Sequence, residues 1–439
     1  MRRISTKILS VLIIVVCTTI LQDLRAQYTL SSPYSRFGIG YKSLSSNQTS
    51  YSMGGVGYAF ARNNEVNMLN PASLFEIQKE SFVFNMGFDL NWRNLSSSNK
   101  SSNAFVASIT NISLAFPIFD RWKIGLTLSP FTDIDYLASD TILSTINRVK
   151  TFEGNGGVDR FTASVSYQPV KSEKHNLSLG ANFTYYFGNI YRSSSLSFLT
   201  QRDSVGVLRD TTGFFDNSTE KNYDVSSIGI DFGLQYFYNI NNDDRMGIGL
   251  TFTPKYKLHT TKKQMFYTCY TYSAQDYIQD TLSYSEKDVD ITMPMKLGVG
   301  ISYERKNKLF AEMDFTYTQW SDFDFEMQTE NSLKDNWQLN LGLEYTPDAG
   351  SAMYLKKIAY RFGIYYDNGY IFLQDNRIKD YGITFGMAIP IKKLGTKVNL
   401  SFGYGRQGTT DNNLIKEDYF RIGMSLSAKD RWFVKRKYQ

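Results

Sequence analysis

The stretch from Tyr419 to Ser427, YFRIGMSLS, alternates apolar and polar side chains with a period of two. Every second residue from Phe420 to Leu426 is apolar, and the residues between them are arginine, glycine and serine. This alternation is typical of a β-strand that has one face against apolar material and one toward water. Because the pattern recurs along the chain, the sequence predicts an all-β fold.

Thirteen earlier stretches repeat the pattern. The predicted strands centre on residues 82–92, 105–116, 122–128, 161–167, 177–187, 228–238, 246–252, 297–303, 309–317, 337–345, 358–364, 381–389, 398–404 and 419–427. Tyrosine or tryptophan tends to stand at their ends, as Trp92, Trp122 and Tyr404 do. Such residues form the aromatic girdles of membrane β-barrels, so the sequence favours a barrel over a water-soluble sandwich.

The connections between these strands alternate in length. The long ones are 93–103, 133–157, 199–222, 259–289, 326–335, 367–379 and 406–417, and those between them are mostly short. Long extracellular loops opposite short periplasmic turns are typical of outer-membrane barrels. An unpaired edge in lipid leaves N–H and C=O groups unsatisfied, so the strands must close into a ring. We therefore predict a 14-stranded antiparallel transmembrane β-barrel in the outer membrane of a Gram-negative bacterium, with both termini in the periplasm.

The N-terminal region has two parts. Basic residues at Arg2, Arg3 and Lys7 precede an apolar run, and Ala26 offers a small residue for cleavage, as in a secretory signal peptide. The following segment is rich in glycine and serine but too apolar for a free tail. Fourteen strands enclose a bore wider than wall side chains fill, so this segment is expected to plug it. The predicted divisions are a signal peptide 1–26, a hatch or plug 27–80, a barrel 81–428 and a short periplasmic tail 429–439.

Composition excludes several classes of protein. The formal net charge of +6 is spread along the chain, which gives no support to nucleic-acid binding. Cys269 is the one cysteine after the expected cleavage site, and His175 and His259 lie far apart in sequence. These residues offer no metal site and no nucleophile–histidine pair. The sequence therefore predicts no metal, no cofactor and no enzymatic activity.

Two short motifs stand at defined places in this pattern. Asn70-Pro71-Ala72 lies just before the first predicted strand, and GLTLSPF at 125–131 ends the third. With a plug and fourteen strands, these motifs resemble the FadL/TodX family of outer-membrane transporters for hydrophobic compounds, over most of the mature chain. The resemblance implies passive diffusion of a hydrophobic small molecule, such as a long-chain fatty acid or an aromatic. It implies release through a gap at the third strand into outer-membrane lipid, past the lipopolysaccharide layer.

The resemblance also suggests residues. Asn70, Pro71 and Ala72 would latch the hatch, although Asn70 is also suited to a simple turn or cap before proline. Pro130 and Phe131 would mark the lateral opening, because proline lacks the N–H for a ladder bond. The alternative for Pro130 is an ordinary proline at a strand end.

Further candidates face the expected bore. Tyr34, Phe37 and Phe60 would line a substrate path or, alternatively, anchor the plug. Alternation also turns charged residues inward, and we expect them to form a paired, solvated network that holds the hatch: Asp89, Asp231, Lys296, Glu312, Asp314, Glu344, Arg361 and Arg421.

Two other functions remain open on the same barrel. A FadL-like adaptor in protein secretion or surface assembly, of the PorV type, would dock a protein partner on the long connections 199–222 and 259–289. A general porin would instead hold a water-filled bore.

Overall fold

The structure is a computed structural model that describes residues 32–43, 47–98, 100–143, 148–198, 215–272, 275–326, 332–391 and 395–431. The expected signal peptide and residues 432–439 of the expected tail lie outside this range. No helix among the described residues is long and apolar enough to cross a lipid bilayer.

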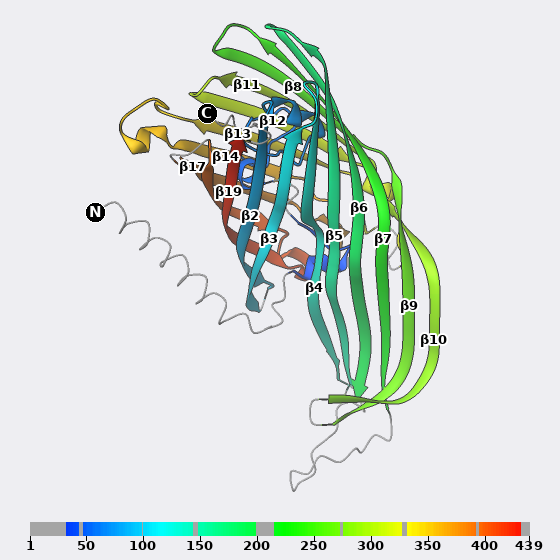
Figure 1. Cartoon of the computed structure of the whole chain (residues 1–439). Helices are drawn as coiled ribbons and strands as arrows, with labels where there is room; N and C mark the ends of the chain where they lie inside the picture. Colours follow the sequence, from blue (N-terminus) through cyan, green and yellow to red (C-terminus); the bar gives the residue numbers. More distant parts are fainter. Residues whose placement is uncertain are drawn as a thin grey trace, which may run out of the picture.

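Antiparallel strands form a closed ring around the plug segment (Figure 1). The wall strands are β2 (Ser81–Ser96), β3 (Ser101–Pro117), β4 (Trp122–Ile142), β5 (Arg148–Lys171), β6 (His175–Phe198), β7 (Asp216–Asn239), β8 (Asp244–Thr253), β9 (Tyr256–Tyr272), β10 (Gln275–Met293), β11 (Lys296–Arg305), β12 (Leu309–Thr318), β13 (Asn336–Tyr345), β14 (Ala359–Asp367), β17 (Asp380–Pro390), β18 (Lys397–Gln407) and β19 (Lys416–Arg431).

At two places in this ring, a proline interrupts one wall strand and leaves two shorter strands in line. β8 and β9 both pair with β7 and are separated at Pro254, and β10 and β11 are separated at Pro294. Proline cannot donate a ladder hydrogen bond, so each strand breaks there and resumes. The ring thus has fourteen strand positions. It closes where β19 pairs with β2 from Lys416↔Ser96 to Arg431↔Ser81, which confirms the predicted 14-stranded antiparallel barrel.

The two faces of the wall differ as the alternation predicted. On the last strand Phe420 is 41% exposed, whereas its neighbour Arg421 is 7% exposed and faces the bore. The same holds around the ring, where exposed aromatic and aliphatic side chains such as Phe88 and Leu250 form the outer surface. This apolar belt is suited to contact with lipid.

The prediction of a long loop is wrong at three places. Residues 133–157 and 259–289 are largely strand, because β4, β5, β9 and β10 run through them. β7 already begins at Asp216, within the third. A strand of 24 residues, as in β5, β6 and β7, spans roughly 80 Å. This exceeds the bilayer core of about 30 Å, so these strands project far beyond the barrel as a curved sheet (Figure 1).

The plug segment (residues 32–43 and 47–80) fills much of the ring. It contains η1 (Pro33–Arg36), β1 (Tyr41–Lys42), α2 (Gln48–Tyr51) and η2 (Pro71–Glu76). Met53 and Val56 are fully buried. At Gly249 on β8 the wall comes so close that a Cβ would overlap the Tyr58 carbonyl, and at Gly180 on β6 a Cβ would overlap the backbone at Ala72.

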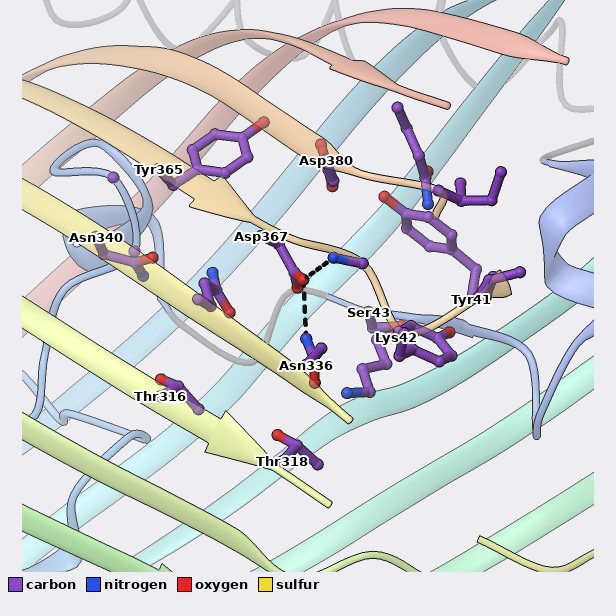
Figure 2. A pocket seen from close by; sticks show the side chains of 18 of the residues that line it. Tyr41, Lys42, Ser43, Thr316, Thr318, Asn336, Asn340, Tyr365, Asp367 and Asp380 are labelled. Carbon is purple, nitrogen blue, oxygen red and sulfur yellow. Dashed lines mark hydrogen bonds between the residues drawn. The ribbon is translucent and has the colours of Figure 1, made fainter. Parts of the chain in front are cut away.

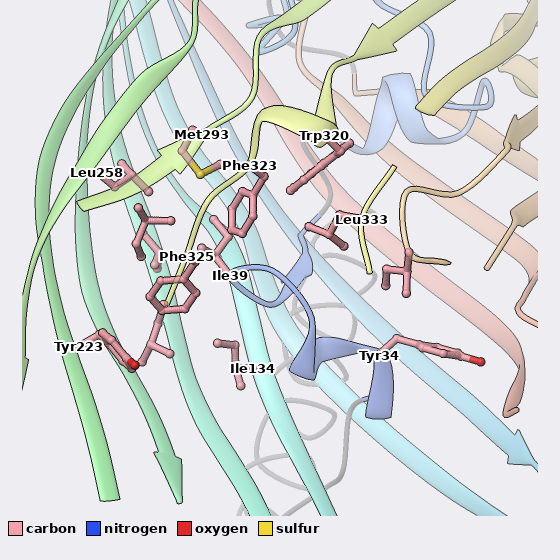
Figure 3. Close-up of a cluster of buried hydrophobic side chains, with 14 of the residues drawn as sticks. Tyr34, Ile39, Ile134, Tyr223, Leu258, Met293, Trp320, Phe323, Phe325 and Leu333 are labelled. Carbon is pink, nitrogen blue, oxygen red and sulfur yellow. The ribbon is translucent and has the colours of Figure 1, made fainter. Parts of the chain in front are cut away.

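An apolar cluster joins the plug to the projecting sheet (Figure 3). Tyr34 and Ile39 of the plug contribute to it, with Leu258 and Met293 of β9 and β10. The connection after β12, which contains η3 (Trp320–Asp322), supplies further rings. The other connections carry η4 (Tyr354–Lys357), η5 (Asp411–Asn413), β15 (Phe372–Leu373) and β16 (Asn376–Arg377).

Candidate functional site

The wall is incompletely bonded between β3 and β4. These two strands pair only from Ile112↔Leu128 to Pro117↔Lys123. Beyond Leu128, β4 keeps its ladder with β5, and beyond Ile112, β3 keeps its ladder with β2. The two neighbours therefore separate along the rest of their length.

Both strands beside the separation carry a bulge. On β4 the register against β5 shifts between Pro130 and Thr132, so Phe131 is the extra residue. On β3 the register against β2 shifts across Gly87 and Phe88, so Thr110 is the extra residue. A bulge bends its strand and increases its local twist, which directs the two strands apart.

A cavity of about 580 Å³ lies at this separation. Thr110 on β3 and Pro130 on β4 both line it, together with residues of β2, β5 and β19. Phe131 packs instead on Tyr186, with ring centroids 4.8 Å apart, and the guanidinium of Arg160 lies 5.6 Å from its ring. Of the two residues expected at the opening, Pro130 thus borders the cavity and Phe131 anchors the bulge to the wall.

The plug supplies a short strand where β3 has left β4. In β1, Tyr41 pairs with Asp133 and Lys42 with Thr132, and the Ser43 N–H donates to the Phe131 carbonyl at 3.1 Å. This bridge was not predicted from the sequence, because a two-residue strand has no periodic signal. It covers part of the separation from the inside.

A second cavity of about 230 Å³ is lined by Tyr41, Lys42 and Ser43 of the plug, among other residues (Figure 2). Tyr41, Ser43 and Arg421 line both cavities. Lys42 borders the second one, and its ammonium lies 4.4 Å from the ring centroid of Trp320. Burial, reinforced by the charge of Lys296, lowers the pKa of Lys42 to about 8. The two cavities are therefore neighbours beside β1.

Asn70 connects the plug to two wall strands. Its Oδ1 accepts a hydrogen bond from the Ala72 N–H at 3.1 Å, which caps η2. Its Nδ2 donates to the carbonyls of Tyr58, Leu234 and Leu250 at 2.8, 3.2 and 3.3 Å. The local cap and the contact with the wall therefore coexist in one buried side chain.

The rest of the motif lies against β5 and β6. The Ala72 carbonyl accepts hydrogen bonds from Ser166 and Ser178 hydroxyls at 3.1 and 2.7 Å. Pro71 packs where Gly233 leaves room, since a Cβ there would approach the proline ring. The three residues thus fix η2 on the inner wall.

Two carboxylates on β12 hold backbone N–H groups of the plug. Asp314 Oδ2 accepts from Gly57 at 2.7 Å and Tyr58 at 3.0 Å, and Glu312 Oε1 accepts from Ala59 at 2.5 Å. These wall residues, both expected in the inner network, are direct anchors of the plug.

A second group of charges surrounds Arg62 of the plug. Arg62 contacts Glu304 at 2.7 Å and Glu344 at 3.1 Å. Arg361 contacts Glu344 at 2.8 Å and reaches Glu65 of the plug at 3.8 Å. Glu344 and Arg361 thus join the predicted network. Arg62 and Glu304 were not predicted, because nothing in the sequence aligns the plug with a particular strand.

The remaining expected network residues are dispersed. Arg421 and Asp89 lie 4.0 Å apart beside the first cavity. Lys296 lines the second cavity. Asp231 pairs in register with Asn182 on β6 and joins none of these ion pairs.

The three aromatic residues expected on a substrate path have different surroundings. The Tyr34 hydroxyl donates to the Ile415 carbonyl at 2.5 Å, and Tyr34 lines the second cavity. Phe37 packs against the apolar cluster. Phe60 is buried edge-on against Phe310, with centroids 5.3 Å apart, and borders neither cavity.

Within the described ranges, no three His, Cys, Asp or Glu side chains are grouped so as to hold a metal ion. The arrangement consists of a separated pair of wall strands and two cavities that share lining residues of the plug.

The comparisons with known proteins concern the whole chain. The family model BamG matches residues 7–439. The toluene transporter TbuX of Ralstonia pickettii has a similar structure, with a TM-score of 0.57, 17% identity, and coverage of 89% of this chain and 99% of that one. A Pseudomonas aeruginosa FadL homologue has a TM-score of 0.53 and 14% identity, with coverage of 90% of this chain and 100% of that one. The toluene transporter TodX of P. putida has a TM-score of 0.53 and 14% identity, with coverage of 89% of this chain and 100% of that one. No curated protein matches the sequence significantly.

Proposed function

The chain belongs to the BamG family and has the fold of the FadL-like barrels, and from this premise we propose that it is a passive outer-membrane channel for hydrophobic small molecules. The observation that carries the proposal is the separation of β3 from β4 beyond Leu128, with a cavity of about 580 Å³ at it. A barrel that only anchored the chain would have no reason to leave a wall ladder unmade in lipid.

The proposed path crosses the plug. A long-chain fatty acid or an aromatic such as toluene would be collected at the apolar cluster near Tyr34 and enter the second cavity. Displacement of β1 would join the two cavities, and the molecule would leave sideways past Pro130 into lipid. The proposed latch, Asn70, Pro71 and Ala72, would keep η2 in place during this movement. No energy source is needed, because partition into lipid is favourable for apolar surface.

The orientation follows from the two ends of the barrel. The projecting sheet would face the cell exterior and the tight turns the periplasm, as in other outer-membrane barrels. Both termini of the ring, at Ser81 and Arg431, would then lie on the periplasmic side.

Uptake measurements test the channel. Cells with and without the protein, matched for outer-membrane protein content, would be given radiolabelled hexadecanoate and radiolabelled toluene at low concentration. We expect faster early accumulation of at least one compound in cells that contain the protein. Equal rates for both compounds would overturn the proposal.

A specific observation favours a second function, that of an adaptor in surface assembly. β10 (Gln275–Met293) borders the projecting sheet, and its ladder runs along β9. On its other side, within the described residues, a single bridge joins Thr292 to Asp324 near the end of the strand. Exposed Ile278 and Tyr284 lie on this edge strand. Such an edge is a template for the strand of a protein partner.

Cross-linking separates the two functions. A photo-cross-linking residue at Ser285 would capture a partner of defined mass in stoichiometric yield if the edge is occupied. Capture of a partner, together with equal hydrocarbon uptake by cells with and without the protein, would favour the adaptor. Faster uptake by cells that contain the protein, without capture of a partner, would favour the channel.

A further inference from the structure

Several buried polar side chains line the cavity at the β3–β4 separation, where a path for pure hydrocarbon would need none. Asp89 and Asn91 of β2 and Thr132 of β4 line it. They are 5%, 5% and 3% exposed, so each is withdrawn from bulk solvent. Each nevertheless holds an oxygen without a hydrogen-bond partner among the described residues: Asp89 Oδ1, Asn91 Oδ1 and Thr132 Oγ1.

Buried acceptors without partners are rare in folded proteins, because leaving them unpaired costs free energy. Asp89 Oδ1 and Asn91 Oδ1 come from alternate residues of one strand and so lie on the same face. Two such oxygens beside one cavity form a pre-arranged receptor for a group that donates several hydrogen bonds.

The charge of the lining selects the sign of that group. Asp89, Asp133 and Asp159 line the cavity, against Arg93 and Arg421.

Both guanidinium groups have other contacts. Arg93 is paired with Glu417 at 2.7 Å and lies 4.2 Å from the ring centroid of Tyr41. Arg421 Nε lies 4.0 Å from Asp89 Oδ2 in the same cavity, and the guanidinium lies 5.5 Å from the ring centroid of Tyr419. The Nε atoms of both arginines have no hydrogen-bond partner among the described residues, but aspartates outnumber arginines in the lining, which favours a cation.

The margins of the separation have the opposite character. Ile109 on β3 is 47% exposed and Leu128 on β4 is 43% exposed. They stand on the two strands that separate, on the side of the belt. A molecule that occupied both regions would place a polar head inside and an apolar chain outside.

We propose that this cavity binds the primary ammonium head of an amphiphile, whose alkyl chain passes between β3 and β4 into the membrane. The ammonium donates to Asp89 Oδ1 and Asn91 Oδ1. The inference rests on the proposed lateral opening and names the class of molecule that uses it. A free alkylamine and an ethanolamine lipid carry the same head, and the test compares them.

Binding would be measured by isothermal titration on the protein in phosphatidylcholine nanodiscs, with empty nanodiscs subtracted. The probes are dodecylamine, dodecyltrimethylammonium, dodecanoate and lysophosphatidylethanolamine. We expect dodecylamine to bind roughly ten-fold more tightly than the trimethyl compound, which has the charge but no N–H donor, and than dodecanoate. Tight binding of the lysolipid alone would identify a lipid as the natural source of the head, and tight binding of both would admit either.

Variants assign the binding to the cavity. Asp89→Asn and Asn91→Ala should each weaken dodecylamine roughly ten-fold. Asp231→Asn, on the inner wall but outside this cavity, should leave binding unchanged. Heat-modified migration in gels would show that each variant is folded. If one variant fails to fold, the other decides.

Equal affinity for dodecylamine, dodecyltrimethylammonium and dodecanoate, or full affinity in a folded Asp89→Asn variant, would overturn the inference. The outcome is separable from that of the channel. Selective binding without any uptake would support the head-group site and overturn the channel. Uptake without selective binding would support the channel and overturn the head-group site.

Discussion

Tyr41 of the plug pairs in antiparallel register with Asp133 of β4, at the level where β3 has left that strand. A piece of the plug thus takes the place of a wall neighbour. Because β1 contributes only Tyr41 and Lys42 to the ladder, its release requires few hydrogen bonds to break. This contact is the natural gate of the proposed path.

A disulfide would test the gate. In a Cys269→Ser background, the pair Tyr41→Cys and Asp133→Cys places two thiols on paired residues, which lie within the Cα range that a disulfide spans. We expect uptake to fall to the level of cells without the protein when the pair is oxidised and to recover on reduction. The control pair Ala311→Cys and Leu343→Cys, on paired residues of β12 and β13, should have no effect. Equal uptake by the oxidised and reduced gate pair would refute this role.

The β4 bulge can be removed. Deleting Phe131 takes out the extra residue between Pro130 and Thr132 and should let β4 run straight beside β3. We expect the deletion to reduce uptake several-fold. Phe131→Ala keeps the bulge but loses the contact with Tyr186, so it should preserve uptake while lowering stability by about 0.5–3 kcal/mol. The reverse order of effects on uptake would show that the ring, not the bulge, matters.

Asn70 can be tested by a nearly isosteric change. Asn70→Asp retains the oxygen that caps η2 but replaces the amide donor, so that a carboxylate faces the carbonyls of Tyr58, Leu234 and Leu250. Burying that charge without donors is costly. We expect the temperature at which the folded band converts to the unfolded band in gels to fall more for Asn70→Asp than for Asn70→Ala. Asn103→Asp, at an exposed position on β3, is the control. A smaller loss for Asn70→Asp than for Asn70→Ala would mean that the cap alone is important.

Loss of a carboxylate that holds the plug should let ions leak through the barrel. Asp314→Ala leaves the Gly57 and Tyr58 N–H groups without their acceptor, which costs about 1–3 kcal/mol for each buried donor. The plug should then leave its position more often, so that planar bilayers containing the variant show steady ion conductance. The wild-type protein and Glu286→Ala, an exposed position on β10, should remain nearly closed. A closed Asp314→Ala protein would argue that other contacts suffice.

Lys42 predicts a dependence on pH. Its pKa is lowered from 10.5 to about 8, chiefly by burial. Between these values the unfolded chain binds more protons than the folded one, so stability rises with pH through this window and the penalty is fully present below it. The midpoint of urea unfolding should therefore increase more from about pH 7 to about pH 10 in the wild-type protein than in Lys42→Met. Parallel curves for the two proteins would contradict the assignment.

The barrel was predictable because lipid and bore impose opposite demands on neighbouring residues. Phe420 and Arg421 differ in exposure for that reason, and the pattern is strongest within the bilayer. Beyond it, both faces of a strand meet water or protein. Alternation is therefore absent from Lys262-Lys263-Gln264 of β9, which was predicted to be part of a loop.

The site was only partly predictable. Proline at position 130 signals a broken ladder through its missing N–H, but nothing local shows that Phe131 is the bulged residue. Asp314 was expected to face the bore, whereas its partners at Gly57 and Tyr58 lie some 250 residues away. Such contacts depend on how far the plug is inserted, which the period of a strand does not encode.

The close fit at Gly249 and Gly180 has a consequence for biogenesis. With the Tyr58 carbonyl and the Ala72 backbone filling the spaces that side chains would occupy, the plug leaves little room to thread through a finished ring. The seam between β2 and β19 joins the wall residues that are farthest apart in the chain, so we expect it to form last. The leading segment must therefore be seated while that seam is open, and whatever folds this protein into its membrane has to wait for it before letting the cylinder seal.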